Sequence, residues 1–301
     1  MNPIDRMDGL GGSDAAAVCG LSRWKTVLAL WAEKTGQVQS KDDPSLAKTL
    51  GTRLEEVVAE LFTEQTGKKV ARVNDRITHP RYPFIHGRID RKVVGEDAIL
   101  ECKTASAWKA KEWEGEEIPR EYILQCYHYL SLRPAWKKIY LAVLIGNQNF
   151  KWKEIERDDK IIADLTMREI DFWENFVVPK IMPAQLTSKD AETLYALYPL
   201  AESGSEITLD DTINQQIESR NAMIQDVKAL EAQIEKAENE IKAALKDKEL
   251  GRSEQWIVTW RNQVTRRLDT GLLKEQKPEL YQQYLKDIPS RVLRIKEMKH
   301  E

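Results

Sequence analysis

One aspartate and a Glu-x-Lys triplet flank a short turn in a stretch of sequence that is typical of a β-hairpin. Asp90 precedes one strand-like run, Glu101 and Lys103 end the next, and Gly95-Glu96 lies between the two runs. A two-residue turn with glycine at its first central position is a type II′ turn. In that register the numbers of paired residues sum to 191, so Asp90 lies opposite Glu101. Opposed residues of an antiparallel pair have Cβ atoms about 4.5–5.5 Å apart on one face.

Two carboxylates this close repel each other unless a cation lies between them, and oxygen ligands suit Mg²⁺ or Mn²⁺. The two-residue period of a strand places Lys103 on the face of Glu101 and turns the Cys102 side chain to the other face. A divalent metal beside a lysine is the arrangement that metal-dependent phosphodiester cleavage requires. The triplet alone is weak, because Glu-x-Lys recurs at 240–242 and 297–299 without a paired acid. Without Asp90 it describes a solvated cross-strand ion pair more often than a site.

The composition is that of an ordinary globular protein. Its 301 residues suffice for one large or two modest domains, and 42% of them are hydrophobic. The net charge of −3 means that a DNA-binding surface must concentrate its basic residues locally. Cys19, Cys102 and Cys126 lack metal-ligand spacing, which argues against zinc and iron–sulfur sites and for reduced thiols. We find neither a secretory segment nor an apolar run of membrane-spanning length, and therefore expect a cytoplasmic protein.

The order of helical and strand-like patterns predicts an α/β fold. Apolar residues recur at helical spacing from Ala47 to Thr66, and Gly67 ends that helix. Further helices are expected at Thr26–Lys34, Pro119–Leu132 and Ile161–Val177, and strands at Lys69–Val73, Phe84–Val94, Ala98–Thr104, Lys138–Ile145 and Lys151–Ile155. Ser13 or Asp14 is expected to cap a short helix. This order favours a mixed sheet flanked by helices.

The sequence changes character after Pro183. Residues 202–249 carry a net charge of −6, and their apolar residues from Met223 to Ala244 alternate spacings of four and three. This pattern is typical of a coiled helix that pairs with another helix, or of one amphipathic helix lying on the preceding body. Residues 252–301 carry a net charge of +4 and contain strand-like runs at Trp256–Trp260 and Val292–Ile295, around a helix at about 271–285.

Three further polar features could reach the hairpin. Glu55, on the first long helix, could lean over the edge of the sheet, or it is a solvated helix residue. Gln125 and Tyr129 are i and i+4 on a later helix, so they share a face that could hold a water or a phosphate; a surface glutamine and a core tyrosine are the plainer alternative. Arg6 and Ser13 flank a Gly-rich turn at a helix N-terminus, where backbone N–H groups favour a phosphate.

Taken together, these motifs resemble one known family. They occur in the order Gly11-Gly12-Ser13-Asp14-Ala15-Ala16, Leu21-Ser22-Arg23-Trp24-Lys25-Thr26, Leu30-Trp31-x-Glu33-Lys34-Thr35-Gly36, Gly51-x-x-x-Glu55, Gly87-x-x-Asp90, Glu101-x-Lys103 and Gln125-x-x-x-Tyr129. The ordered set resembles the YqaJ-type viral recombinases, relatives of phage lambda exonuclease within the PD-(D/E)XK nucleases, over residues 6–180. The resemblance implies a restriction-endonuclease-like core, with a mixed sheet flanked by helices, at 1–183. We expect a linker at 184–207, an amphipathic or coiled helix at 208–250 and a small α+β appendix at 251–301.

The resemblance also implies a metal site. Asp90 and Glu101 would bind Mg²⁺, or Mn²⁺ in its place, together with the backbone carbonyl of Cys102. Glu55 would complete the metal shell, directly or through a water. The family usually has a proline before the aspartate, and Ile89 stands there in this chain.

The remaining matches imply catalytic and substrate-binding roles. Lys103 would position and polarise the attacking water, and Gln125 would orient that nucleophile or a second metal. Ser13 and Arg6 would match a pocket that recognises a 5′-phosphate, and Tyr129 would contact the substrate beside Gln125.

The activity that the resemblance implies is that of a Mg²⁺-dependent 5′→3′ exonuclease on linear double-stranded DNA, which releases 5′-phosphorylated nucleotides and leaves 3′ overhangs. Such relatives are encoded by phages or prophages. They work in the bacterial cytoplasm as rings, often trimers, and pass the single strand to a RecT-type or Beta-type annealing protein. An endonuclease, or a nuclease of another polarity, would use the same residues. A DNA-binding or assembly protein with a decayed nuclease core is a third alternative, although all five expected catalytic side chains are present.

Overall fold

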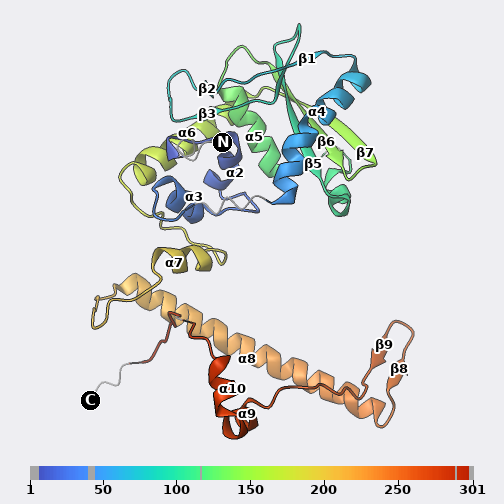
Figure 1. Cartoon of the computed structure of the whole chain (residues 1–301), viewed down its shortest axis with the longest axis vertical. Helices are drawn as coiled ribbons and strands as arrows, with labels where there is room; N and C mark the ends of the chain where they lie inside the picture. The colour runs from blue at the N-terminus through green and yellow to red at the C-terminus, as the bar shows by residue number, and fades with distance from the viewer. Residues whose placement is uncertain (1–6, 40–44, 116, 289, 298–301) are drawn as a thin grey trace. The chain divides into compact units, whose positions relative to one another are not determined.

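The computed structural model describes residues 7–39, 45–115, 117–288 and 290–297, and the chain divides into two compact units, residues 1–199 and 200–301. Figure 1 shows the helices and strands of both units. Every predicted site residue that is described lies in the first unit. The first unit therefore contains the candidate site.

The first unit is built on a five-stranded mixed sheet with the strand order β1-β4-β5-β6-β7 (Figure 1). The strands are β1 (Val70–Arg72), β4 (Arg91–Val93), β5 (Ala98–Ala105), β6 (Lys138–Ile145) and β7 (Asn149–Glu156). Neighbouring strands are antiparallel except β5 and β6, which are parallel. Helix α5 (Arg120–Ser131) lies between β5 and β6 in the chain, as a parallel connection requires. The predicted mixed sheet flanked by helices is confirmed.

Helices α4 (Leu46–Thr66) and α5 cover opposite faces of the sheet. Phe62 of α4 belongs to an apolar cluster with Leu100, whereas Leu130 of α5 belongs to a cluster with Ile99. Because neighbouring residues of a strand point to opposite faces, the two clusters lie on the two sides of β5. Glu101 and Lys103 share the α5 face with Ile99. Gly67 ends α4 as predicted, with a φ of +70°.

The predicted hairpin register is confirmed. Arg91 pairs with Leu100 and Lys92 with Ile99, and Gly95 has a φ of +84°, as the first central residue of a type II′ turn requires. The single strand predicted at 84–94 is wrong, because the chain forms β3 (His86–Gly87), which pairs with β2 (Ile77–Thr78), and then β4. The break at 88–90 has a physical cause: the Asp90 carboxylate, rather than a backbone carbonyl, accepts the N–H of Cys102.

Two short helical segments begin the described chain, η1 (Gly12–Asp14) and α2 (Ala15–Val18), and α3 (Val27–Lys34) follows. Thr26 caps α3 by accepting from the backbone N–H of Ala29. Asp14 is the N-cap residue of α2, one of the two predicted positions, but its side chain makes no cap hydrogen bond to that helix. The Asp14 side chain is instead paired with Lys34.

The rest of the first unit supports this body. Segment η2 (Ala107–Trp113) follows β5, and α6 (Asp159–Phe172) continues into a single π-helical turn, η3 (Trp173–Val177). Helix α7 (Ala191–Leu197) lies inside the range 184–207 that we expected to be a linker. Asp190, just before α7, is 1% exposed and accepts a hydrogen bond from Thr26 at 2.5 Å.

The second unit contains α8 (Asp211–Leu245), the hairpin β8 (Leu250–Arg252) with β9 (Ile257–Thr259), and the short helices α9 (Thr270–Gln276) and α10 (Pro278–Gln283). The long helix predicted from the heptad pattern is present, and Asp210 caps its N-terminus. The strand predicted at Val292–Ile295 is wrong, since these residues form no regular element and their backbone pairs with no described strand. Within the described ranges, no helix combines the length and apolar character needed to cross a bilayer.

Candidate active site

The two predicted metal-binding carboxylates come together at the start of the β4–β5 hairpin. Asp90 lies immediately before β4, and its Oδ2 accepts the backbone N–H of Cys102 at 2.7 Å. Glu101 lies within β5 and is only 3% exposed. The hydrogen bond fixes Asp90 against the strand that carries Glu101. Two acids that are eleven residues apart in the sequence therefore share one site.

One oxygen of Glu101 is fully engaged and the other is not. Its Oε1 lies 2.7 Å from Nζ of Lys103 and accepts a 2.7 Å hydrogen bond from Nε2 of Gln125. Nε2 of Gln125 also donates to the hydroxyl of Tyr129 at 3.0 Å, which confirms the shared face of α5. Gln125 is 8% exposed, so the alternative of a surface glutamine is wrong. The Oε2 atom of Glu101 is buried and has no hydrogen-bond partner within the described part of the chain.

The charges of this site are strongly coupled. Burial and the neighbouring Glu101 raise the pKa of Asp90 to about 8, so bringing a second negative charge here is unfavourable without a cation. Burial by itself would lower the pKa of Lys103, but the attraction of the carboxylates of Glu101 and Asp90 is stronger, so the pKa of the lysine is raised. Lys103 is therefore a fixed positive charge beside Glu101.

These residues fit a divalent cation. Glu101 has an unsatisfied buried carboxylate oxygen and lies beside a second carboxyl, Asp90, whose pKa is raised by burial and by repulsion from Glu101. Together they provide the oxygen donors that Mg²⁺ and Mn²⁺ prefer. Among the residues that the structure describes, no group of three or more His, Cys, Asp or Glu side chains is arranged to hold a metal. The carboxylates therefore form a pair to which a third ligand has to be added.

The predicted third carboxylate is held by a residue that sequence reasoning missed. Arg91 is 2% exposed and donates to Oε1 of Glu55 at 2.5 Å, to Oε2 of Glu56 at 2.9 Å and to the carbonyl of Asp90 at 2.7 Å. Glu55 is close enough to contribute to the raised pKa of Asp90. The sequence did contain a signal for this contact: Arg91 directly follows Asp90, and the helix carries two adjacent acids, Glu55 and Glu56.

Two glycines of the sequence motifs are required by the ring of Tyr129. A Cβ atom on Gly12 would lie 2.7 Å from the ring carbon Cε1 of Tyr129, and one on Gly87 would lie 2.6 Å from the same atom. Real Cβ atoms do not approach this closely, so larger residues would displace the ring. Because Gly12 precedes Ser13, this contact places the N-terminal turn beside the Gln125–Tyr129 pair.

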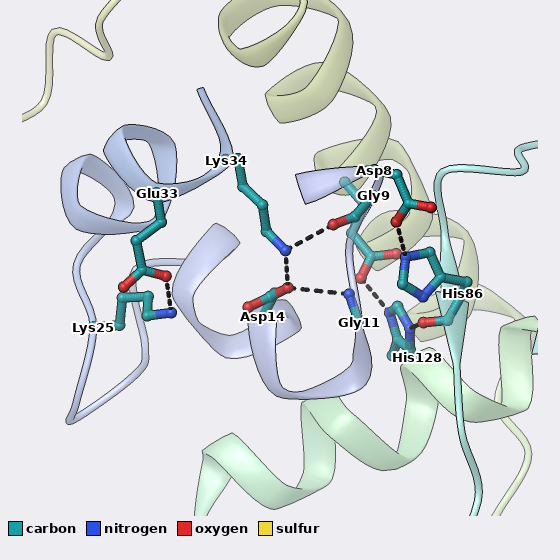
Figure 2. A network of polar contacts seen from close by, with 10 residues as sticks. Asp8, Gly9, Gly11, Asp14, Lys25, Glu33, Lys34, His86 and His128 are labelled. Atoms are coloured by element: carbon teal, nitrogen blue, oxygen red, sulfur yellow. Dashed lines mark hydrogen bonds and ion pairs between the residues drawn. The ribbon is translucent and has the colours of Figure 1, made fainter. Parts of the chain in front are cut away.

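A buried lysine holds the N-terminal turn in place (Figure 2). Nζ of Lys34 pairs with Oδ2 of Asp14 at 2.6 Å and donates to the carbonyl of Gly9 at 2.7 Å. The same oxygen of Asp14 accepts the backbone N–H of Gly11 at 3.1 Å. These contacts hold the residues on either side of Ser13, whose own side chain is exposed. Arg6, the second residue predicted to bind the phosphate, lies outside the described residues.

A second buried pair joins α5 to α6, and its histidine also contacts β3. Nδ1 of His128 lies 2.6 Å from Oε1 of Glu169 on α6. Its Nε2 lies 2.9 Å from the carbonyl oxygen of His86, and Figure 2 shows these two histidines. Burial opposes the charge of His128, but Glu169 outweighs it and raises the pKa of the imidazole. A charged imidazole donates through both nitrogens, which satisfies both contacts. Burial and Arg76 lower the pKa of His86 to about 4.

Comparison with known proteins identifies the family. The sequence pattern of the YqaJ-like viral recombinase domain matches residues 4–132. The chain is 42% identical to the protein YqaJ of Bacillus subtilis (strain 168) over 297 residues, which cover 98% of this chain and 93% of that protein.

Solved structures of an alkaline exonuclease have a similar fold. LHK-Exo of Laribacter hongkongensis is 19% identical, with a TM-score of 0.51 over 59% of this chain and 92% of that one. LHK-Exo in complex with dAMP is 21% identical, with a TM-score of 0.50 over 58% of this chain and 91% of that one. The five-stranded mixed sheet with its flanking helices thus resembles the alkaline exonuclease fold. The sequence matches show that the chain belongs to the family of YqaJ-like viral recombinase domains.

Proposed function

We propose that this protein is a metal-dependent 5′→3′ exonuclease with a PD-(D/E)XK site, which degrades linear double-stranded DNA and leaves 3′ single-stranded overhangs. The observation that carries the proposal is the pairing of the half-buried Asp90 with the buried Glu101, with Lys103 held on the second carboxylate. The free Oε2 of Glu101 and the suppressed ionisation of Asp90 both favour a cation at this position.

Asp90, Glu101 and the backbone carbonyl of Cys102 are the proposed ligands of the metal, Mg²⁺ or Mn²⁺. Bound Mg²⁺ lowers the pKa of a coordinated water and stabilises negative charge on phosphate oxygens. Glu55 is the proposed additional ligand, directly or through a water, and Arg91 holds its carboxylate by the Oε1 atom.

The other residues position the reactants. Lys103 supplies a compact cation that holds the attacking water against the scissile phosphate. Gln125 has both Glu101 and Tyr129 as partners, so its amide is held rigidly enough to orient the nucleophile, with Tyr129 on the substrate side. Attack of water at phosphorus breaks the bond to the 3′ oxygen and releases a 5′-phosphorylated nucleotide.

The N-terminal turn is the proposed receptor for the 5′-phosphate. Ser13 is exposed on a turn that is anchored by Lys34 and packed on Tyr129 through Gly12, and Arg6 is proposed to add a positive charge. A phosphate held there would place the 5′ end of the strand beside the metal site. The dAMP bound by LHK-Exo is a nucleotide of the kind that such cleavage would release.

The proposed setting follows the family. We propose a ring, with three subunits as the expected number, that threads linear duplex in a bacterial cytoplasm, encoded by a phage or prophage. Its single-stranded product would pass to a RecT-type or Beta-type annealing protein. Processivity would then come from topology rather than from tight binding.

The proposal is tested by comparing linear duplex with covalently closed circles, each with Mg²⁺ and with EDTA. Loss of the linear DNA alone, and only with Mg²⁺, is the expected result. Cleavage of the closed circle would make the protein an endonuclease with the same site. Binding without cleavage under Mg²⁺ or Mn²⁺ would make it a non-catalytic DNA-binding protein.

A further inference from the structure

Two strongly exposed tryptophans flank the candidate active site. Trp24, in the loop before α3, is 62% exposed, and Trp108, the second residue of η2, is 96% exposed. Segment η2 directly follows β5, the strand that carries Glu101 and Lys103. Large apolar side chains that remain this exposed beside a site commonly mark a binding surface.

A tyrosine connects Trp24 to the catalytic lysine proposed above. The ring centres of Trp24 and Tyr122 are 6.1 Å apart, and Nζ of Lys103 lies 5.4 Å from the ring centre of Tyr122. Tyr122 also stacks on the buried Trp113, with ring centres 5.3 Å apart. Only the ring of Tyr122 lies between Trp24 and Lys103 in this chain of contacts, and that ring is itself packed on the buried Trp113.

Positive charge accompanies the exposed rings. The guanidinium of Arg23, which also pairs with Glu112 and Glu121, lies 5.6 Å from the ring centre of Trp24. Nζ of Lys109, the residue after Trp108, lies 5.9 Å from the same ring centre. A cavity of about 310 Å³ opens beside Trp24, and its wall includes Lys189 and Lys25, the latter paired with Glu33. Aromatic rings interleaved with cations are the features by which proteins hold unpaired nucleic-acid strands, because bases stack on the rings while cations meet the phosphates.

We infer that Trp24 and Trp108 form a stacking platform for unpaired nucleobases of the DNA strand next to the scissile phosphate. This inference rests on the proposed nuclease function and adds to it the binding of bases outside the metal site. The short path from Trp24 to Lys103 favours DNA over a protein partner as the occupant. The platform would hold bases irrespective of sequence, since every base has a face that can stack.

The test measures DNA binding by the full chain in EDTA, where the proposed cleavage is silent. The probes are fluorescent duplexes with a short single-stranded end, made with normal nucleotides or with abasic nucleotides in the unpaired part. Trp24→Ala and Trp108→Ala are compared with Trp256→Ala, a matched control that removes a 71% exposed indole from the second unit. Circular dichroism verifies that each variant is folded, and Trp24→Tyr tests whether another ring restores binding.

Each platform variant is expected to bind the normal probe about 5- to 100-fold more weakly than the wild type, and Trp24→Tyr to recover much of the loss. On the abasic probe the wild type should fall to the level of the variants, because there is no base to stack. Unchanged binding by both alanine variants, equal losses on both probes, or no DNA binding by the wild type would overturn the inference. Failure of the nuclease proposal would give a different result. The variants and the abasic probe would still show the expected loss of binding in EDTA, but the wild type would not cleave DNA in Mg²⁺.

Discussion

The buried pair of His128 and Glu169 gives the sharpest prediction of stability. Both side chains are 0% exposed, and His128 also contacts the carbonyl of His86, four residues before Asp90. Replacing Glu169 by glutamine removes the negative charge and keeps the volume. Removing one member of a buried ion pair typically costs about 3–5 kcal/mol, because the other charge stays buried without compensation. For a unit of 199 residues this predicts a fall in Tm of roughly 6–20 °C.

The pH dependence has a definite sign. Glu169 raises the pKa of His128 above its usual 6.5, so folding takes up a proton. The stabilisation is therefore fully present below about pH 6.5 and is lost as the pH rises through the raised value in the folded state. The difference in the free energy of unfolding between the wild type and Glu169→Gln should be largest at acid pH and shrink as the pH rises.

Urea denaturation of the two proteins at several pH values measures this difference directly. Asp164→Asn is the matched control, since it breaks an exposed pair with Arg168 on the same helix and should cost no more than about 0.5 kcal/mol. A loss below 1 kcal/mol for Glu169→Gln, or a difference that grows with pH, would refute the reasoning.

Four further substitutions test the site and the packing around it. Lys103→Ala should abolish cleavage and leave DNA binding in EDTA largely intact, as compared in parallel nuclease and binding assays; retained cleavage would remove the lysine from the mechanism. Gly87→Ala should cost about 1–3 kcal/mol in denaturation experiments because its Cβ meets Tyr129, whereas Gly51→Ala, at an uncrowded position within α4, should stabilise by about 0.5–1 kcal/mol. Ser13→Ala should reduce the preference for 5′-phosphorylated over 5′-hydroxyl ends in competition digests, and an unchanged preference would refute the phosphate assignment.

The centre of the site was predictable because its determinants are local. The glycine turn fixed the register that sets Asp90 beside Glu101, and the period of a strand placed Lys103 on the same face. The spacing of Gln125 and Tyr129 placed both on one side of a helix. Each of these relations depends on residues that are within one hairpin or one helical turn.

The parts that sequence reasoning missed depend on contacts between distant segments. Arg91 meets Glu55 across 36 residues of chain, and His128 meets Glu169 across 41, so neither pair could be read from local spacing. The break before β4 follows from a hydrogen bond between Asp90 and the backbone of Cys102, which no propensity scale contains. The apolar run at 292–295 has strand-like composition but no neighbouring strand to complete its hydrogen bonds.

The central claim is that Asp90 and Glu101 hold a metal that drives cleavage from the 5′ end. The most direct measurement digests linear duplex with a 5′-phosphate on one strand and a distinct label at each end. Wild type and Asp90→Ala are each incubated with Mg²⁺ and with EDTA. We predict mononucleotides released progressively from the 5′ side by the wild type in Mg²⁺ alone. Cleavage that persists in EDTA or in Asp90→Ala would contradict the claim.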